Sequence, residues 1–190
     1  MSKPLQKRTL ATRAKLIASA EKIISAKGYA AMRVEDVVAQ AGVAKGTFFA
    51  HFPDKDALMD LIVGAEMDKQ LDQVAAKAPP QTVDELIEHI MPFLNFVSHD
   101  RYTFDLIIRH SGAGAKEEFG PIALTFERQI KILTTWLATG PFRKDVDPQV
   151  LAEGIQAFYV QCMAMHFCSI NKEPPMQIRL TTYLKAWLLA

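Results

Sequence analysis

The chain has 190 residues, of which 49% are hydrophobic and 23% are charged, and its formal net charge is +1. This length allows one or two domains with a substantial core. The first ten residues carry charges but no apolar run, and the longest charge-free run, Gly154–Asn171, includes two glutamines, a histidine, a serine and an asparagine. We therefore expect no signal peptide and no membrane span, and we expect the protein to be cytoplasmic.

The small net charge hides an uneven distribution. Residues 1–55 hold ten Lys or Arg against four Asp or Glu, whereas residues 56–190 hold twelve against seventeen. A basic N-terminal part on an acidic body suits a protein that binds phosphates with one end. Solvated helix faces and a basic terminus are the alternative explanation of the same charges.

The first predicted helix covers Thr12–Gly28. Its apolar residues fall on one face at helical spacing: Leu16, Ile17, Ala20, Ile23 and Ile24. Gly28 is expected to end the helix, because glycine accepts the left-handed backbone found at helix ends.

Two further helices are predicted on either side of a tight turn at Gly42. The helix Val34–Ala41 carries apolar residues at positions 34, 37, 38 and 41, and a second helix of about two turns follows the glycine. In that second helix Val43, Phe48 and Phe52 are expected to point inward, and Lys45, Thr47, Phe49 and His51 outward. A helix, a short glycine turn and a helix form the helix-turn-helix pattern, whose second helix fits the DNA major groove.

The stretch Val34–Leu58 resembles the tetracycline-repressor (TetR) family, in which a motif of the form AGVSxGTxYxHFxxKxxL closes the DNA-binding domain. The matching residues are Ala41, Gly42, Val43, Gly46, Thr47, His51, Phe52, Lys55 and Leu58. The resemblance covers about the first 60 residues. It implies an all-α fold with an N-terminal three-helix helix-turn-helix head, residues 1–54, on an α-helical ligand-binding and dimerisation body, residues 55–190.

The sequence departs from the family pattern at the helix starts. Met32 and Arg33 stand where the family usually has Thr or Ser, and Ala44 replaces the Ser that opens the recognition helix. Loss of an N-cap oxygen costs about 1 kcal/mol, which Glu35 and Asp36 should partly offset through the helix dipole.

The resemblance implies that Arg33, Lys45, Thr47, Phe49, His51 and Lys55 contact duplex DNA. Lys45 is the best candidate for a base edge or a nearby phosphate, and Thr47 and Lys55 suit phosphates. Phe49, which replaces the usual Tyr, is expected to pack on a thymine methyl or on the sugar-phosphate backbone. His51 has a structural alternative, as a group hydrogen-bonded at the helix end.

The rest of the chain is predicted to be helical, without strands. A helix capped by Asp54 runs towards Ala76, and others cover about Thr82–Ser98, Tyr102–His110 and Glu117–Ala138. Pro92 is expected to kink the helix Thr82–Ser98, and the SGAGA segment after His110 is expected to form a loop. Pro121 fits a helix only near its start, as in Glu117–Ala138. After Gly140-Pro141, Asp147 is a predicted N-cap with Pro148 at the first helical position.

The helix after Pro148 carries apolar residues on more than one side, so more than one side must be buried. Besides a large apolar stripe, it has a stripe of mostly small residues: Gly154, Ala157, Gln161, Ala164 and Cys168. Together with Tyr183 and Trp187 of the last helix, this stripe looks like the two-helix surface through which the family forms homodimers. The alternative is that both stripes pack within one monomer.

The body is rich in Phe and Met, and in this family it usually encloses a pocket for a small, largely apolar effector. The residues proposed to line such a pocket are Phe96, Phe104, Phe126 and Phe158, with Arg109, His110 and His166 as anchors for a polar end. Most of the aromatic residues should nevertheless be plain core.

No motif for catalysis, for a cofactor or for a metal site is present in the sequence. Asp105 and Arg109 form an ordinary i, i+4 pair, and Cys162 and Cys168 are expected to stay reduced on different helix faces. We therefore predict a ligand-responsive TetR-like repressor, not an enzyme, that binds a palindromic operator as a homodimer. A small helical enzyme or carrier of apolar molecules without DNA binding, and a protein-interaction adaptor, are the alternatives.

Overall fold

A computed structural model describes residues 3–111, 119–167 and 173–189. Over these residues the chain forms helices and no strand, which confirms the all-α fold. The helices are α1 (Lys3–Lys27), α2 (Val34–Ala41), α3 (Lys45–Phe49), α4 (Lys55–Ala75), α5 (Val83–Val97), α6 (Arg101–His110), α7 (Pro121–Thr139), α8 (Pro148–Phe167) and α9 (Met176–Leu188).

The two predicted aspartate N-caps are confirmed. Asp54 accepts a hydrogen bond from the Ala57 amide at 2.7 Å, and Asp147 accepts one from the Gln149 amide at 2.8 Å. Each carboxylate thereby satisfies an amide that has no partner within its helix, and also meets the positive end of the helix dipole.

Three predicted helix boundaries differ from the structure. Helix α7 begins at Pro121 rather than at Glu117, because Gly120 has an extended backbone and proline fits only the first turn of a helix. Helix α3 has five residues instead of two turns, and α1 already begins at Lys3. Pro92 lies inside one continuous helix α5. Apart from Ser111, the predicted SGAGA loop lies outside the described residues.

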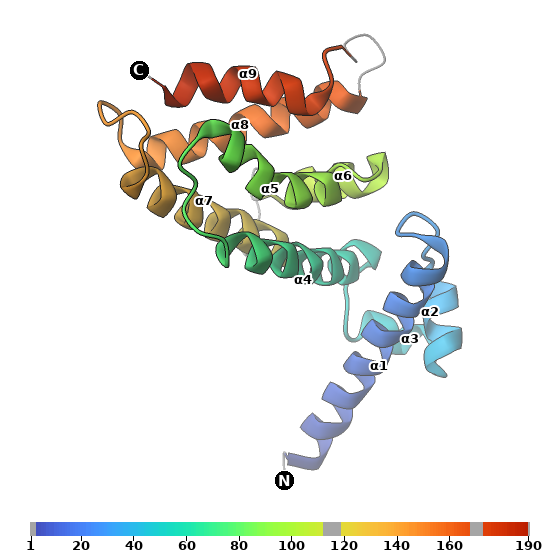
Figure 1. Ribbon diagram of the computed structural model, residues 1–190. Coiled ribbons are helices and arrows are strands. Elements are labelled where there is room, and N and C mark those ends of the chain that lie inside the picture. Colours follow the sequence, from blue (N-terminus) through green and yellow to red (C-terminus); the bar gives the residue numbers. More distant parts are fainter. Residues whose placement is uncertain (1–2, 112–118, 168–172, 190) are drawn as a thin grey trace.

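Helices α1–α3 form a unit, here called the head, that projects from the other helices, here called the body (Figure 1). Helix α4 runs from the head into the body, where it packs against α5, α6 and α7. Helix α8 lies between α7 and α9 at the far side of the body. The start of α1 points away from the body.

Each part has its own buried apolar residues. The head buries Leu16, Met32, Val37, Phe48 and Phe52, which join its three helices. In the body, buried positions on α4, such as Met59, Val63 and Met67, meet the apolar faces of α5 and α7. No helix within the described ranges is both long and apolar enough to cross a bilayer.

Candidate functional site

The turn between α2 and α3 depends on Gly42. Its backbone is left-handed, with φ +66°, and its amide donates to the carbonyl oxygens of Val38 and Ala39 at the end of α2. An L-side chain rarely adopts this conformation, so glycine at this point permits the sharp change of direction. As predicted, neither Arg33 before α2 nor Ala44 before α3 provides a side-chain cap.

The inner side of α3 anchors it to the head. Phe48 is fully buried and Phe52 is almost so, and their rings lie 5.6 Å apart. Both predicted core assignments are therefore confirmed. Phe49, one residue after Phe48, is 48% exposed and packs edge-on against the Phe48 ring at 5.3 Å. The amphipathic pattern thus fixes which side of α3 faces away from the protein.

The other predicted DNA contacts of the head differ in exposure. Arg33 and Lys45 are exposed, whereas Thr47 and His51 are half-buried. The Lys45 ammonium lies 2.6 Å from a Glu35 carboxylate oxygen, and the hydrogen bond from Lys45 lowers the pKa of Glu35. Because both side chains are exposed, the pair is weak and Lys45 can exchange its carboxylate partner for another anion.

Lys55 lies at the boundary between head and body rather than beside α3. It is half-buried in the first turn of α4, and its ammonium is 4.9 Å from the centre of the Tyr102 ring of α6. The ring face attracts the cation. Contact of Lys55 with DNA stays a prediction.

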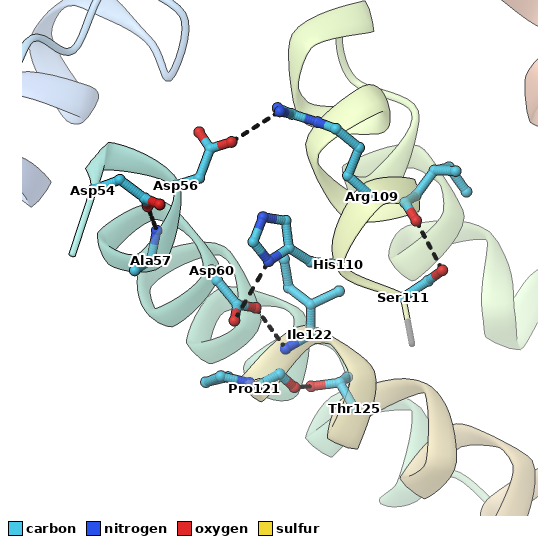
Figure 2. Close-up of polar contacts among 11 residues, drawn as sticks. Asp54, Asp56, Ala57, Asp60, Arg109, His110, Ser111, Pro121, Ile122 and Thr125 are labelled. Carbon is cyan, nitrogen blue, oxygen red and sulfur yellow. Dashed lines mark hydrogen bonds and ion pairs between the residues drawn. The ribbon is translucent and has the colours of Figure 1, made fainter. Parts of the chain in front are cut away.

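The first turns of α4 are tied to α6 and α7 by two aspartates (Figure 2). Asp56 pairs with Arg109 at 2.8 Å near the surface. One turn later the buried Asp60 accepts a hydrogen bond from the Ile122 amide at 3.1 Å and lies 3.6 Å from His110 Nδ1. The Asp60 carboxylate thus caps the N-terminus of α7 and also meets the end of α6. Any side chain on Gly120 would collide with it.

This junction changes the interpretation of two predicted ligand anchors. Arg109 and His110 face aspartates of α4, although Arg109 also borders a hollow. The predicted Asp105–Arg109 side-chain pair is wrong, because Asp105 pairs with Arg101 at 3.5 Å and Arg109 reaches Asp56.

The remaining predicted pocket residues do not meet at one place. Phe126 lines a hollow of about 330 Å³ together with Ile130, Gln156 and neighbouring residues. Phe104 and Arg109 line another, of about 420 Å³, next to Tyr102, whose buried hydroxyl has no hydrogen-bond partner among the described residues.

Three predicted pocket residues line neither hollow. Phe96 packs edge-on against Tyr29 of the head, and Phe158 packs between Tyr183 and Trp187 of α9. His166 is exposed at the end of α8, against Phe167, which in turn packs on Phe104. Behind the Phe126 hollow, Tyr159 donates to Gln129 at 2.5 Å, and burial raises the pKa of Tyr159.

The predicted dimer surface divides into two kinds of position. Ala157, Gln161 and Ala164 are exposed on one side of α8. Gly154 is instead covered within the chain, because the Trp187 ring packs directly over it and donates a hydrogen bond to the Leu151 carbonyl oxygen at 3.1 Å. Tyr183 packs on Phe158, and Cys168 lies outside the described residues.

Comparisons with known proteins agree with this geometry. Residues 16–62 match the family described as bacterial regulatory proteins, tetR family. This segment includes α2 and α3, so the head of the chain has the sequence of a TetR-family DNA-binding domain. The chain is 22% identical over 163 residues to YerO of Bacillus subtilis (strain 168), an uncharacterized HTH-type transcriptional regulator. This alignment covers 80% of the chain and 56% of YerO. The chain thus spans little more than half the length of the curated relatives it matches.

Two solved structures share the fold. RolR in complex with resorcinol has a TM-score of 0.68 and 21% identity, with 96% of this chain and 90% of that chain covered. Thermus thermophilus FadR, a TetR-family transcriptional repressor in complex with lauroyl-CoA, has a TM-score of 0.64 and 13% identity, with 92% of both chains covered. The matched family consists of regulatory proteins and FadR is a transcriptional repressor, so these comparisons point to a regulator and not to an enzyme.

The contacts of Asp60 with α6 and α7 were not predicted from the sequence. A signal was nevertheless present, because Asp60 interrupts the otherwise apolar run from Leu58 to Val63. An acidic residue within the buried stripe of a helix requires a polar partner. The sequence does not show which amide supplies it, since Ile122 is 62 residues away.

We predict that Asp60→Ala lowers the free energy of unfolding by about 2–4 kcal/mol, because it leaves the buried Ile122 amide without an acceptor. Urea denaturation measures the change. Asp56→Ala, one turn earlier and only half-buried, is the control and should cost less than about 1 kcal/mol. Asp60→Asn keeps an acceptor oxygen and should recover part of the loss. Equal effects of the two alanine substitutions would contradict a structural role of the buried carboxylate.

Proposed function

We propose that this chain is a cytoplasmic, ligand-responsive TetR-family repressor that binds a palindromic operator as a homodimer. One observation carries the proposal. The outer side of α3, with Lys45 and Phe49 exposed, projects from the head just after the Gly42 turn, within the segment that matches the family. That is the arrangement by which a recognition helix enters the major groove.

The surrounding side chains are given distinct roles in this proposal. Lys45 exchanges Glu35 for a base edge or a phosphate, and Phe49 packs on a thymine methyl or on the backbone. Arg33, Thr47, His51 and Lys55 contact the sugar-phosphate backbone. Residues 1–54 form the DNA-binding domain, and residues 55–190 form the effector and dimerisation domain.

A palindromic operator requires two heads related by a two-fold axis. Exposed small residues on α8 support a close approach of a second copy, because Ala157 and Ala164 leave room for another helix. Two recognition helices then reach successive major grooves about 34–36 Å apart. Tyr183 and Trp187 shape this surface from beneath through their packing on Phe158 and Gly154.

The effector is proposed to be a small, largely apolar molecule bound in the body. The hollow beside Phe126 supports this proposal, because it combines apolar walls with the polar side chains of Glu127 and Gln156. The structural neighbours RolR and FadR hold resorcinol and lauroyl-CoA, respectively. An effector changes operator affinity only if it prefers one relative placement of the two heads.

Lys45→Ala should weaken binding to a duplex selected by the wild-type protein from a randomised library by about 1–3 kcal/mol, and should relax specificity at one position. Fluorescence anisotropy titrations measure both effects. Lys131→Ala, which removes an exposed cation from α7, is the control and should leave affinity unchanged. Failure of the wild-type protein to bind any duplex at low salt would refute the proposed function.

Ala157→Arg should convert the dimer to a monomer and reduce operator affinity at the same time, because it buries an unpaired charge in the close approach of two α8 helices. Sedimentation velocity at micromolar concentration gives the oligomeric state. Ala65→Arg, on an exposed position of α4, should leave it unchanged. A wild-type monomer at this concentration would rule out the dimer model.

Ile130→Trp should fill the hollow beside Phe126 and weaken effector binding at least tenfold without changing DNA affinity in the absence of effector. Operator titrations with a library of small hydrophobic compounds provide the readout. Thr135→Trp, exposed on the same helix, is the control. If compounds that change operator affinity act equally well on Ile130→Trp, the effector site lies elsewhere.

A further inference from the structure

We propose that Arg13 of α1 is a positioning residue for the recognition helix, which it holds in orientation without contacting DNA itself. The expected effect of Arg13 on DNA binding rests on the proposed function, whereas the restraint of α3 by Arg13 can be tested without DNA. In the sequence Arg13 is one of the ten cations of residues 1–55. In the structure its side chain packs against the head.

Arg13 makes two contacts with the end of α3. Its Nη1 donates a hydrogen bond to the carbonyl oxygen of His51 at 2.9 Å, and its guanidinium carbon lies 4.3 Å from the centre of the Phe52 ring. Both partners belong to the turn that closes α3 and leads through Pro53 to α4. A single side chain of α1 therefore restrains the backbone and a core ring of this turn at once.

Helix α3 needs such a restraint because it has little stability of its own. It has five residues, and its N-cap Ala44 offers no side-chain oxygen to the first amides. At the other end the amides of Ala50, His51 and Phe52 turn back onto the carbonyl oxygens of Gly46 and Phe48. A helix this short does not persist without tertiary contacts.

The chemistry of arginine suits this position. A cation at the C-terminal end of a helix meets the negative end of the helix dipole and satisfies a carbonyl that has no partner in the helix. The planar guanidinium can also lie over an aromatic ring while it donates a hydrogen bond at its edge. Lysine can supply the charge and the hydrogen bond, but it lacks the planar group.

The orientation of α3 affects specific and non-specific DNA binding differently. Contacts with base edges require the recognition helix to lie in one register in the groove, whereas phosphate contacts tolerate displacement. Loss of Arg13 should therefore reduce affinity for the selected sequence and leave affinity for unrelated sequences nearly unchanged. Since Arg13 contacts no phosphate in this proposal, the number of counterions released should not change either.

The test compares Arg13→Gln and Arg13→Lys with Lys15→Gln, which removes an exposed cation two residues away. Affinity is measured over a range of salt concentrations for a duplex selected by the wild-type protein and for an unrelated duplex. Arg13→Gln should lower the ratio of the two affinities on the order of ten- to hundredfold at an unchanged salt slope, and Arg13→Lys should restore part of it. Lys15→Gln should leave the ratio unchanged. A loss that is equal for both duplexes, with a salt slope lower by about one, would instead identify Arg13 as a phosphate contact and overturn the proposal.

Amide hydrogen exchange without DNA tests the structural part separately. In Arg13→Gln the amides of Ala50, His51 and Phe52 should exchange faster, while those in the middle of α1 stay protected. Unchanged exchange in α3, or loss of protection throughout α1–α3, would overturn a role confined to the recognition helix. If the wild-type protein bound no DNA, the proposed function would fail, while exchange would still decide whether Arg13 holds α3.

Discussion

The shortness of the recognition helix is the constraint on which the head depends. Five residues cannot sustain a helix in water, so the orientation of α3 has to come from its surroundings. Phe48 and Phe52 fix its inner side, Gly42 sets its direction relative to α2, and Arg13 holds its far end. The core of the head therefore holds the short helix α3 in a fixed orientation and keeps its outer side exposed.

A similar dependence governs the junction between head and body. Helix α4 begins directly after the turn that Arg13 holds, and its first two turns carry Asp54, Asp56 and Asp60. Asp54 caps the helix itself, whereas Asp60 connects it to the end of α6 and the start of α7. Farther along, Asp68 and Asp72 pair with Arg128 of α7. Movement of α6 or α7 would therefore displace the start of α4, next to the head, which is the route by which the proposed effector would act on it.

Local signals in the sequence predicted much of this architecture. Gly42, Asp54, Asp147 and Pro148 act through neighbours a few residues away, so their roles follow from spacing alone. Helical spacing likewise predicted that Phe48 lies on the buried side of α3 and Phe49 on the exposed side. The start of α7 was placed four residues too early, because Gly120 has an extended backbone and the helix begins only at Pro121.

Contacts between distant residues could not be predicted in this way. Arg13 and His51 are 38 residues apart, and Asp60 and Ile122 are 62 apart, so neither pair leaves a periodic pattern. Phe158 illustrates the same limit, because its residue type suggested a pocket whereas the fold packs it against Tyr183 and Trp187 of α9. Features that a local motif defines, such as the Gly42 turn and the buried side of α3, are therefore predicted best.

The proposed function depends on DNA lying against the outer side of α3. Lysine labelling with an amine-reactive reagent, read residue by residue by mass spectrometry with and without saturating duplex DNA, tests it directly. Lys45 should lose most of its reactivity when DNA is bound, and Lys131, exposed on α7, should keep its own. Unchanged reactivity of Lys45 at saturation, or protection confined to lysines of the body, would contradict the claim.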